Sequence, residues 1–200
     1  MWDERYGASE FAYGTEPNDW VREQADRIRP GGPVLCLAAG EGRNAVFLAA
    51  KGHAVTAVDQ SAVGVEKAAQ LARDSGVEIT TVVADLAHHD LGRNVWAAIT
   101  SVYAHMPVAV RGDLHRRVVE ALAPGGIFIL EAYTERQLDM PGLGGPPATR
   151  REMFMSLAAL REELMGLELV VGREVDRHVS EGRHHQGESA VVQVVARKPD

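Results

Sequence analysis

Apolar positions along the chain alternate between short continuous runs and longer segments with helical spacing. Buried strands are predicted at 33–39, 53–59, 77–85, 94–103 and 126–134, where apolar and β-branched residues follow one another. Helices are predicted between them, one of which starts at Ser61 and carries Val65, Ala69 and Ala72 on one face. An earlier helix starts at Asn18 or Asp19. Strands that alternate with helices predict a parallel sheet covered on both faces.

The last third of the chain has a different pattern. Thr149 and Glu152 are spaced as a capping box, followed by a helix with Leu157 and Leu160 on its inner face. Two long strands, at 167–179 and 189–198, are joined by the polar turn "SEGRHHQGE" and should pair as an antiparallel hairpin. The predicted fold class is therefore α/β: a Rossmann-like, doubly wound, mostly parallel sheet that ends in an antiparallel C-terminal hairpin.

Composition narrows the classes of function. The 200 residues suit a single domain, 1–200, and the net charge of -7 disfavours a broad nucleic-acid or anionic-membrane surface. Cys36 is the only cysteine, so an internal disulfide is excluded. The charged first residues, "MWDERYG", do not form a signal-peptide core, and no apolar run approaches the ~20 residues of a membrane span. We expect a cytoplasmic protein that does not act on membranes.

Three predicted strand ends carry residues suited to an adenosine group. Gly40-Glu41-Gly42-Arg43-Asn44-Ala45 follows the first strand and satisfies the loose pattern G-x-G-x-x-G/A. Asp59 ends the second strand, where a carboxylate can accept hydrogen bonds from ribose hydroxyls. Asp85 ends the third, where an acceptor can meet an adenine amino group. Glycines in such a turn can also serve tight packing alone, but the three features together predict an adenosine-containing cofactor.

Both NAD(P) and S-adenosylmethionine contain adenosine. A nicotinamide enzyme usually has a second mononucleotide half, whereas here the fifth strand leads into the hairpin region. The compact dehydrogenases use a Tyr-x-x-x-Lys pair, but the residues four positions after Tyr103 and Tyr133 are Pro107 and Gln137. An NAD(P)-dependent oxidoreductase is therefore the less favoured alternative.

These motifs together resemble class I S-adenosylmethionine-dependent methyltransferases, and more narrowly the tellurite-resistance and thiol-methyltransferase-like group. The resemblance covers nearly the whole chain and rests on "WDERY", "YGTEPN", "GEGRNAVFLA", "VDQS", "ADL", "HMP", "LAPGG", "EAYTERQL", "GGPP" and "EGRHHQG". It implies a seven-stranded sheet whose last strand is antiparallel. It also implies an N-terminal segment, 1–32, that covers the cofactor of a Rossmann-like core, 33–200.

The resemblance assigns the cofactor contacts to residues of the matched motifs. The expected S-adenosyl-L-methionine contacts are Tyr13, Asn18, Gly40, Glu41, Gly42, Asn44, Asp59, Gln60, Asp85 and Leu86. Three positions depart from the family pattern, because Cys36, Ala39 and Ala97 are neutral where an acidic residue is common. These departures favour the alternative of a weakened cofactor site.

His105 and Tyr133, after the fourth strand and at the end of the fifth, are the candidate catalytic or acceptor-contacting residues. Each has an ordinary structural interpretation, as a histidine bonded to a nearby carbonyl and as a packed tyrosine. His178, His184 and His185 match no familiar ligand spacing, so we expect a solvated turn and no metal.

The sequence thus predicts methyl transfer to a small-molecule acceptor. A thiol or chalcogen oxyanion is favoured because such an acceptor ionises without a dedicated base. The glycine- and proline-rich stretch "PGLGGPP" is a candidate gating loop. The alternatives are a non-catalytic protein that binds S-adenosylmethionine, and the oxidoreductase. We expect a monomer or homodimer without a nucleic-acid partner.

Overall fold

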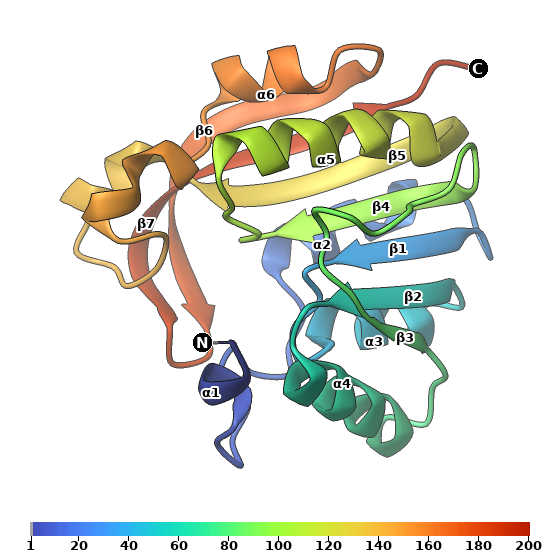
Figure 1. The fold of residues 1–200 in the computed structure, drawn as a ribbon, viewed down its shortest axis with the longest axis horizontal. Helices are drawn as coiled ribbons and strands as arrows, with labels where there is room; N and C mark the ends of the chain where they lie inside the picture. Colours follow the sequence, from blue (N-terminus) through green and yellow to red (C-terminus); the bar gives the residue numbers. More distant parts are fainter. Residues whose placement is uncertain (1) are drawn as a thin grey trace.

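The computed structural model describes residues 2–200 and contains one seven-stranded sheet in the order β3-β2-β1-β4-β5-β7-β6 (Figure 1). β1 to β5 pair in parallel, whereas β7 is antiparallel to both β5 and β6. The strands are β1 (Pro33–Leu37), β2 (Ala54–Asp59), β3 (Thr80–Val83), β4 (Trp96–Val102), β5 (Leu122–Tyr133), β6 (Glu168–Glu181) and β7 (His185–Arg197). The predicted fold class is confirmed.

The strands are apolar on both sides because helices cover both faces of the sheet. In β1, Leu35 and Leu37 pack with α5 (Val108–Ala121) and α6 (Leu157–Glu163), whereas Val34 and Cys36 pack with α2 (Asp19–Gln24) and α3 (Arg43–Ala50). This alternation follows from the period of two in a strand. The remaining helical segments are α1 (Trp2–Tyr6), η1 (Ala25–Arg27), α4 (Ala62–Asp74), η2 (Glu135–Asp139) and η3 (Ala148–Met153).

Two predicted helix starts are confirmed and one is wrong. The side chains of Asn18 and Ser61 cap α2 and α4 by accepting backbone N–H groups. The capping box predicted at Thr149 and Glu152 does not form, because residues 148–153 make a short 3₁₀ segment capped by no side chain. The backbone N–H of Met155 instead donates to the carbonyl of Tyr133 at 3.1 Å, and α6 begins later, after the cap Ser156.

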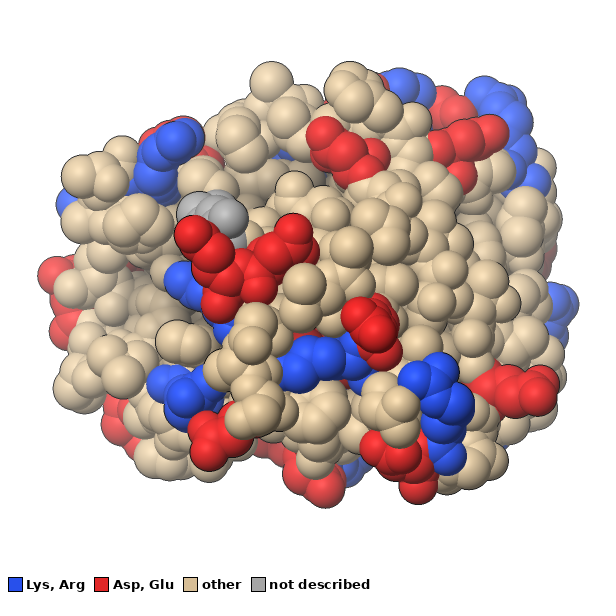
Figure 2. All heavy atoms as spheres, turned by 60° about the horizontal axis from the view of Figure 1, so that its bottom comes forward, with Lys and Arg blue, Asp and Glu red and all other residues tan. Residues whose placement is uncertain are grey.

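The described part of the chain contains no helix with the length and apolarity that a membrane crossing requires. Figure 2 shows one face of the molecule, on which Lys and Arg side chains are interspersed with Asp and Glu. On that face the basic groups do not form a continuous patch of the kind that binds a phosphate backbone.

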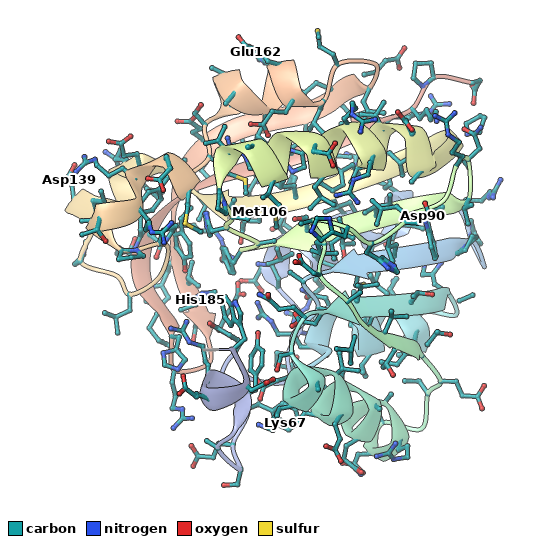
Figure 3. The ribbon with its side chains drawn as sticks, viewed as in Figure 1. Lys67, Asp90, Met106, Asp139, Glu162 and His185 are labelled. Carbon is teal, nitrogen blue, oxygen red and sulfur yellow. The ribbon has the colours of Figure 1, made fainter. Side chains whose placement is uncertain are left out.

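The hairpin and the N-terminal segment meet beyond the carboxyl ends of the parallel strands. The backbone N–H of Arg183, at the tip of the hairpin, donates to the carbonyl of Ala12 at 3.0 Å. Figure 3 shows His185 at the start of β7 and Lys67 on α4, on either side of α1. Of the expected segment 1–32, residues 2–14 therefore lie at this edge of the sheet, whereas α2 packs on a face of the sheet and the residues after it lead into the start of β1. Met1 is outside the described residues.

Candidate functional site

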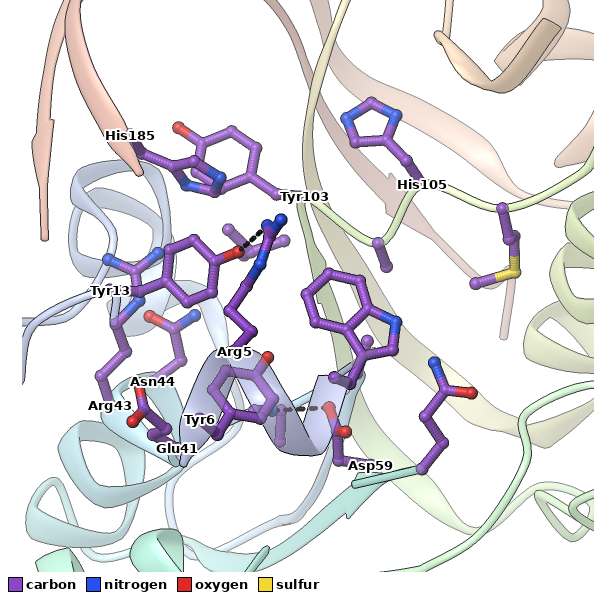
Figure 4. Close-up of a pocket in the computed structure, with 18 of the residues that line it drawn as sticks. Arg5, Tyr6, Tyr13, Glu41, Arg43, Asn44, Asp59, Tyr103, His105 and His185 are labelled. Carbon is purple, nitrogen blue, oxygen red and sulfur yellow. Dashed lines mark hydrogen bonds between the residues drawn. The ribbon is translucent and has the colours of Figure 1, made fainter. Parts of the chain in front are cut away.

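A cavity of about 320 Å³ lies at the carboxyl ends of β1, β2 and β4 (Figure 4). This edge is where open parallel sheets bind ligands. The wall combines the glycine turn, the N-terminal segment, the chain after β4, the loop before η3 and the start of β7. Its main residues are Trp2, Arg5, Tyr6, Tyr13, Ala39, Gly40, Glu41, Arg43, Asn44, Asp59, Gln60, Leu86, Tyr103, His105, Met106, Pro146, Met153 and His185.

The turn after β1 needs its glycines for both conformation and packing. Gly40 and Gly42 have φ angles of +54° and +89°, in the left-handed region that side chains disfavour. A Cβ on Gly42 would lie 2.6 Å from the Cβ of Ala68, and one on Gly40 would lie 2.8 Å from the hydroxyl oxygen of Tyr6. Gly40 lines the cavity, whereas Gly42 brings α3 and α4 together.

Asp59, at the end of β2, is an acidic residue of the cavity wall with only 5% of its surface exposed. Its Oδ2 accepts the backbone N–H of Gly40 at 2.8 Å, and its Oδ1 accepts that of Ser61 at 2.9 Å. Burial raises the pKa of this carboxyl, while the backbone N–H groups act in the opposite direction. Each carboxylate oxygen keeps acceptor capacity, so the side chain facing the cavity fits a ribose diol.

Some of the other residues predicted to contact the cofactor line the cavity, and others lie outside its lining. Tyr13, Gln60 and Leu86 line the cavity. Asp85 is exposed, lies outside the lining, and accepts the backbone N–H of Ala87 at 2.9 Å. Asn18 is fully buried behind the cavity.

Glu41 and Asn44 line the cavity and also hold the N-terminal segment. Glu41 Oε2 accepts the backbone N–H of Ala12 at 2.7 Å, and its Oε1 accepts from Lys67 Nζ at 2.6 Å. Asn44 Oδ1 accepts the backbone N–H of Asn18 at 2.9 Å. Some of the hydrogen-bond acceptor positions of both side chains are therefore already occupied by groups of the protein.

The three neutral positions are not equivalent in space. Cys36 and Ala97 are buried in the core between the sheet and α2, and only Ala39 lines the cavity. Burial raises the pKa of the Cys36 thiol to about 11, so it stays protonated at neutral pH. The neutral residues at positions 36 and 97 therefore leave the charge of the cavity wall unchanged, and among the three positions only Ala39 bears on it.

His105 lines the cavity, but both of its ring nitrogens face backbone groups. Nδ1 lies 2.9 Å from the carbonyl oxygen of Met153, and Nε2 accepts the backbone N–H of Tyr133 at 3.2 Å. Burial lowers the pKa of His105 to about 4. This geometry fixes a neutral tautomer that donates from Nδ1, and it favours the structural interpretation of this histidine.

Tyr133 is fully buried and does not line the cavity. Its ring stacks on that of Tyr103 at a centroid distance of 4.6 Å, and its hydroxyl has no hydrogen-bond partner among the described residues. Tyr103 faces the cavity instead, from a strained backbone with φ of +53°. Burial and the neighbouring Glu131 raise the pKa of Tyr103, whose hydroxyl donates to Glu131 Oε1 at 2.7 Å.

A buried ionic network supports this wall. Arg177 Nη2 contacts Glu131 Oε1 and Glu181 Oε1, each at 2.7 Å, and Arg43 Nη2 contacts Glu181 Oε2 at 2.5 Å. Asn18 Nδ2 donates to both Glu131 and Glu181. The network was not predicted, because its members are spread over 163 positions of the chain.

His185 was also missed, because the sequence places it in a polar turn. The turn prediction holds for His184, which is exposed between the two strands, but it is wrong for the other two histidines. His178 is exposed but lies in β6, and His185 begins β7, is 8% exposed and lines the cavity. The strands extend to Glu181 and resume at His185, so the turn is shorter than expected. Among residues 2–200, no three His, Cys, Asp or Glu side chains are grouped as a metal site.

Comparison with known proteins gives one match to a family model and one informative curated relative. Residues 34–126, somewhat under half of the chain, match the model described as "Methyltransferase domain". A 2-heptyl-1-hydroxyquinolin-4(1H)-one methyltransferase of Mycobacteroides abscessus is 26% identical over 143 residues, which cover 69% of this chain and 62% of the relative. The chain thus spans less than two thirds of that relative's length.

Solved structures share the fold at low sequence identity. TehB from Haemophilus influenzae has a TM-score of 0.75 at 18% identity, with 98% of this chain and 65% of that chain covered. The [4+2]-cyclase SpnF has a TM-score of 0.74 at 18% identity, with 99% and 93% covered. The predicted resemblance to class I S-adenosylmethionine-dependent methyltransferases is confirmed.

Proposed function

We propose that this chain transfers a methyl group from S-adenosylmethionine to a small-molecule acceptor. The observation that carries the proposal is Asp59, a buried carboxylate that meets the glycine turn and faces a cavity of about 320 Å³ at the carboxyl edge of the sheet. The match of residues 34–126 to a methyltransferase domain supports it.

The residues around Asp59 fit the adenosine end of this cofactor. Asp59 would accept from the ribose hydroxyls, Gln60 and Leu86 would contact the nucleoside, and Gly40 permits close approach of the backbone. When bound, the cofactor supplies a methyl group activated on a sulfonium. The protein would contribute orientation and exclusion of water, which in favourable cases provide roughly 7–11 kcal/mol. Trp2, Tyr6 and Tyr13 of the N-terminal segment would cover the site.

We propose an acceptor that is small and mainly apolar. The cavity lining includes Tyr13, Tyr103, Met106 and Met153, which suit a flat apolar molecule better than a hydrated oxyanion. The named substrate of the Mycobacteroides relative is a hydroxyquinolinone, which has this character. The thiol or chalcogen acceptor expected from the sequence remains the alternative.

We further propose a cytoplasmic monomer or homodimer without a nucleic-acid partner. The net charge of -7 and the mixed charges of the face in Figure 2 support the last point. A second candidate function is cofactor binding without methyl transfer, which the neutral Ala39 at the cavity wall favours. The name of SpnF, a cyclase, also illustrates that one fold serves several reactions.

Calorimetry with S-adenosylmethionine, S-adenosylhomocysteine, NAD and NADP tests the cofactor. We expect micromolar binding of the first two, and preferential binding of NAD(P) would overturn the proposal. A labelled-methyl assay against hydroxyaromatics, thiols, tellurite, amines and RNA then tests the reaction. Turnover of RNA alone would exclude a small acceptor, and tight cofactor binding without any turnover would favour the second candidate.

A further inference from the structure

We propose that His185 accepts the proton of the methyl acceptor, and that the acceptor is a flat aromatic or heteroaromatic molecule with an ionisable hydroxyl. This inference rests on the proposed methyl transfer and names the acceptor class of the same cavity. It makes His185 a catalytic residue, in place of the His105 favoured by the sequence.

Within residues 2–200, His185 has a buried ring nitrogen without a hydrogen-bond partner. His185 is 8% exposed, lines the cavity, and has a buried Nδ1 with no hydrogen-bond partner among the described residues. A buried polar atom without a hydrogen-bond partner is unfavourable, so an imidazole that keeps one beside a cavity indicates a site for a polar ligand atom. His105, the other histidine of the wall, has both nitrogens bonded to backbone groups.

The rings of three tyrosines lie around His185. Its ring centroid lies 4.6 Å from that of Tyr13, 4.3 Å from that of Tyr103 and 5.4 Å from that of Tyr133. The rings of Tyr103 and Tyr133 stand nearly perpendicular to the imidazole and fix its orientation. An aromatic acceptor can pack against the exposed parts of Tyr13 and Tyr103 with its hydroxyl directed at the imidazole.

His185 lies away from the end of the cavity that contains Asp59. In Figure 4, His185 and Tyr103 lie at one end of the drawn cavity and Asp59 lies at the other. The end assigned to adenosine is therefore separate from the end that contains the unpaired imidazole. A molecule bound beside His185 would lie beyond the nucleoside, in the part of the cavity that the acceptor must occupy.

Burial and the nearby cationic groups keep His185 in its neutral form. Burial is the main cause that lowers the pKa of His185 well below its ordinary value of 6.5, and nearby cationic groups add to it. The titratable or charged groups that face it are Arg5, Tyr13, Arg43, Tyr103, His105, Tyr133 and His184. At neutral pH the imidazole is therefore unprotonated, with a nitrogen lone pair that no proton occupies.

The step balances without a further reagent. The acceptor hydroxyl passes its proton to the imidazole, and its oxygen lone pair forms the bond to the methyl carbon. The carbon–sulfur bond breaks, and its electron pair remains on sulfur, which becomes a neutral thioether. The lowered pKa of His185 then favours release of the proton to solvent. A thiol that ionises readily would not need this group.

The test compares His185→Gln with wild type on two matched phenols, one ionised by a nitro group at the assay pH and one un-ionised. General-base catalysis contributes about 100-fold or more, so we expect kcat for the un-ionised phenol to fall by that factor while kcat for the ionised phenol stays within about threefold. For the un-ionised phenol, kcat/KM of the variant should rise about tenfold per pH unit between about pH 6.5 and 8, whereas that of wild type stays level.

The control is His184→Gln, which changes the exposed neighbouring histidine outside the cavity lining and should leave both reactions unchanged. Equal loss for the two phenols, or no loss for either, would overturn the role of His185. Turnover of thiols but of no hydroxyaromatic would overturn the acceptor class and leave the proposed function intact.

A binding experiment keeps the inference testable if no acceptor is methylated. The un-ionised phenol is added to protein saturated with S-adenosylhomocysteine and labelled with ¹⁵N at histidine. A shift of the His185 ring-nitrogen resonance, absent in His185→Gln, is expected. A phenol that binds without this shift, or does not bind, would overturn the inference, whereas failure of the nucleoside itself to bind would count against the proposed function.

Discussion

Asp59 ends β2 and Asp85 follows the end of the neighbouring β3, yet their side chains have different surroundings. Asp59 is buried at the cavity and accepts two backbone N–H groups, whereas Asp85 is exposed and caps only its own loop. The difference arises because the backbone N–H of Gly40 holds Asp59 against the glycine turn, whereas Asp85 meets only the N–H of Ala87 in its own loop. The sequence places both carboxylates at one edge of the sheet but does not determine which one faces the cavity.

Asp59→Ala should weaken binding of S-adenosylhomocysteine by about 2–4 kcal/mol, because hydrogen bonds to a charged group contribute roughly 1.5–3 kcal/mol each. Asp85→Ala, whose side chain lies outside the cavity lining, should change affinity by less than about 1 kcal/mol. Calorimetry on both variants, with circular dichroism to confirm folding, decides the point. Equal losses in the two variants would show that both carboxylates hold the nucleoside.

The surroundings of the histidine rings could not be predicted from the sequence. Strand periodicity places His105 and Tyr133 at strand ends, but the direction of a ring depends on which carbonyl or N–H it meets. His185 was assigned to a turn from its polar neighbours, although it begins a strand whose other end is apolar. The partners that bury it, Tyr13 and Tyr103, lie more than 80 positions away in the sequence.

At the scale of elements, one lysine connects the N-terminal segment to the core. Lys67 Nζ on α4 donates to the carbonyls of Ala8 and Glu10, each at 2.8 Å, and to Glu41 Oε1 at 2.6 Å. It also lies 5.1 Å from the ring centroid of Phe11. A sequence pattern of apolar positions predicts α4 but not this contact, because the side chain lies on the helix face that the pattern leaves polar.

Lys67→Met should loosen residues 8–12 without unfolding the sheet. Breaking a buried ion pair costs about 3–5 kcal/mol, and here the loss falls on the segment that Glu41 and Lys67 hold together. Hydrogen exchange of the amides in this segment, including the Ala12 N–H bonded to Glu41, should accelerate by about 100-fold or more.

The matched control is Lys51→Met, which removes a lysine paired with the exposed Asp26. An exposed pair contributes about 0–1 kcal/mol, so exchange in residues 8–12 should not change. Unaltered exchange in Lys67→Met would show that aromatic packing, and not this lysine, holds the segment on the core.

The elements themselves were largely predictable, and the exceptions have local causes. The alternation of strands and helices follows from apolar periodicity, and Asn18 and Ser61 cap helices as expected. The helix predicted from Thr149 starts later, because the backbone of Met155 bonds to the end of β5. Such a tertiary hydrogen bond competes with local propensity and leaves no periodic signal.

At the scale of the whole molecule, the buried ionic network connects the C-terminal hairpin and the N-terminal segment to the parallel part of the sheet. Arg177 on β6, Glu131 on β5, Arg43 on α3 and Asn18 before α2 meet around Glu181 at the end of the hairpin. Glu131 has no exposed surface and Glu181 is 5% exposed. A buried carboxylate without its cation is strongly destabilising, so the network makes the hairpin, the sheet and the N-terminal segment depend on one another.

Arg177→Met should therefore lower the free energy of unfolding of the whole chain by about 3–5 kcal/mol, because Glu131 loses its cation and Glu181 keeps only Arg43. Arg116→Met is the control, since Arg116 pairs with Asp113 and Glu120 at the surface and its loss should cost less than about 1 kcal/mol. Urea unfolding monitored by tryptophan fluorescence and by circular dichroism measures both variants. If the hairpin were an independent unit, the two probes would separate in Arg177→Met, and the sheet would keep the wild-type midpoint. Coincident transitions at a lower midpoint would instead show that the stability of the cavity wall and that of the fold depend on the same buried charges.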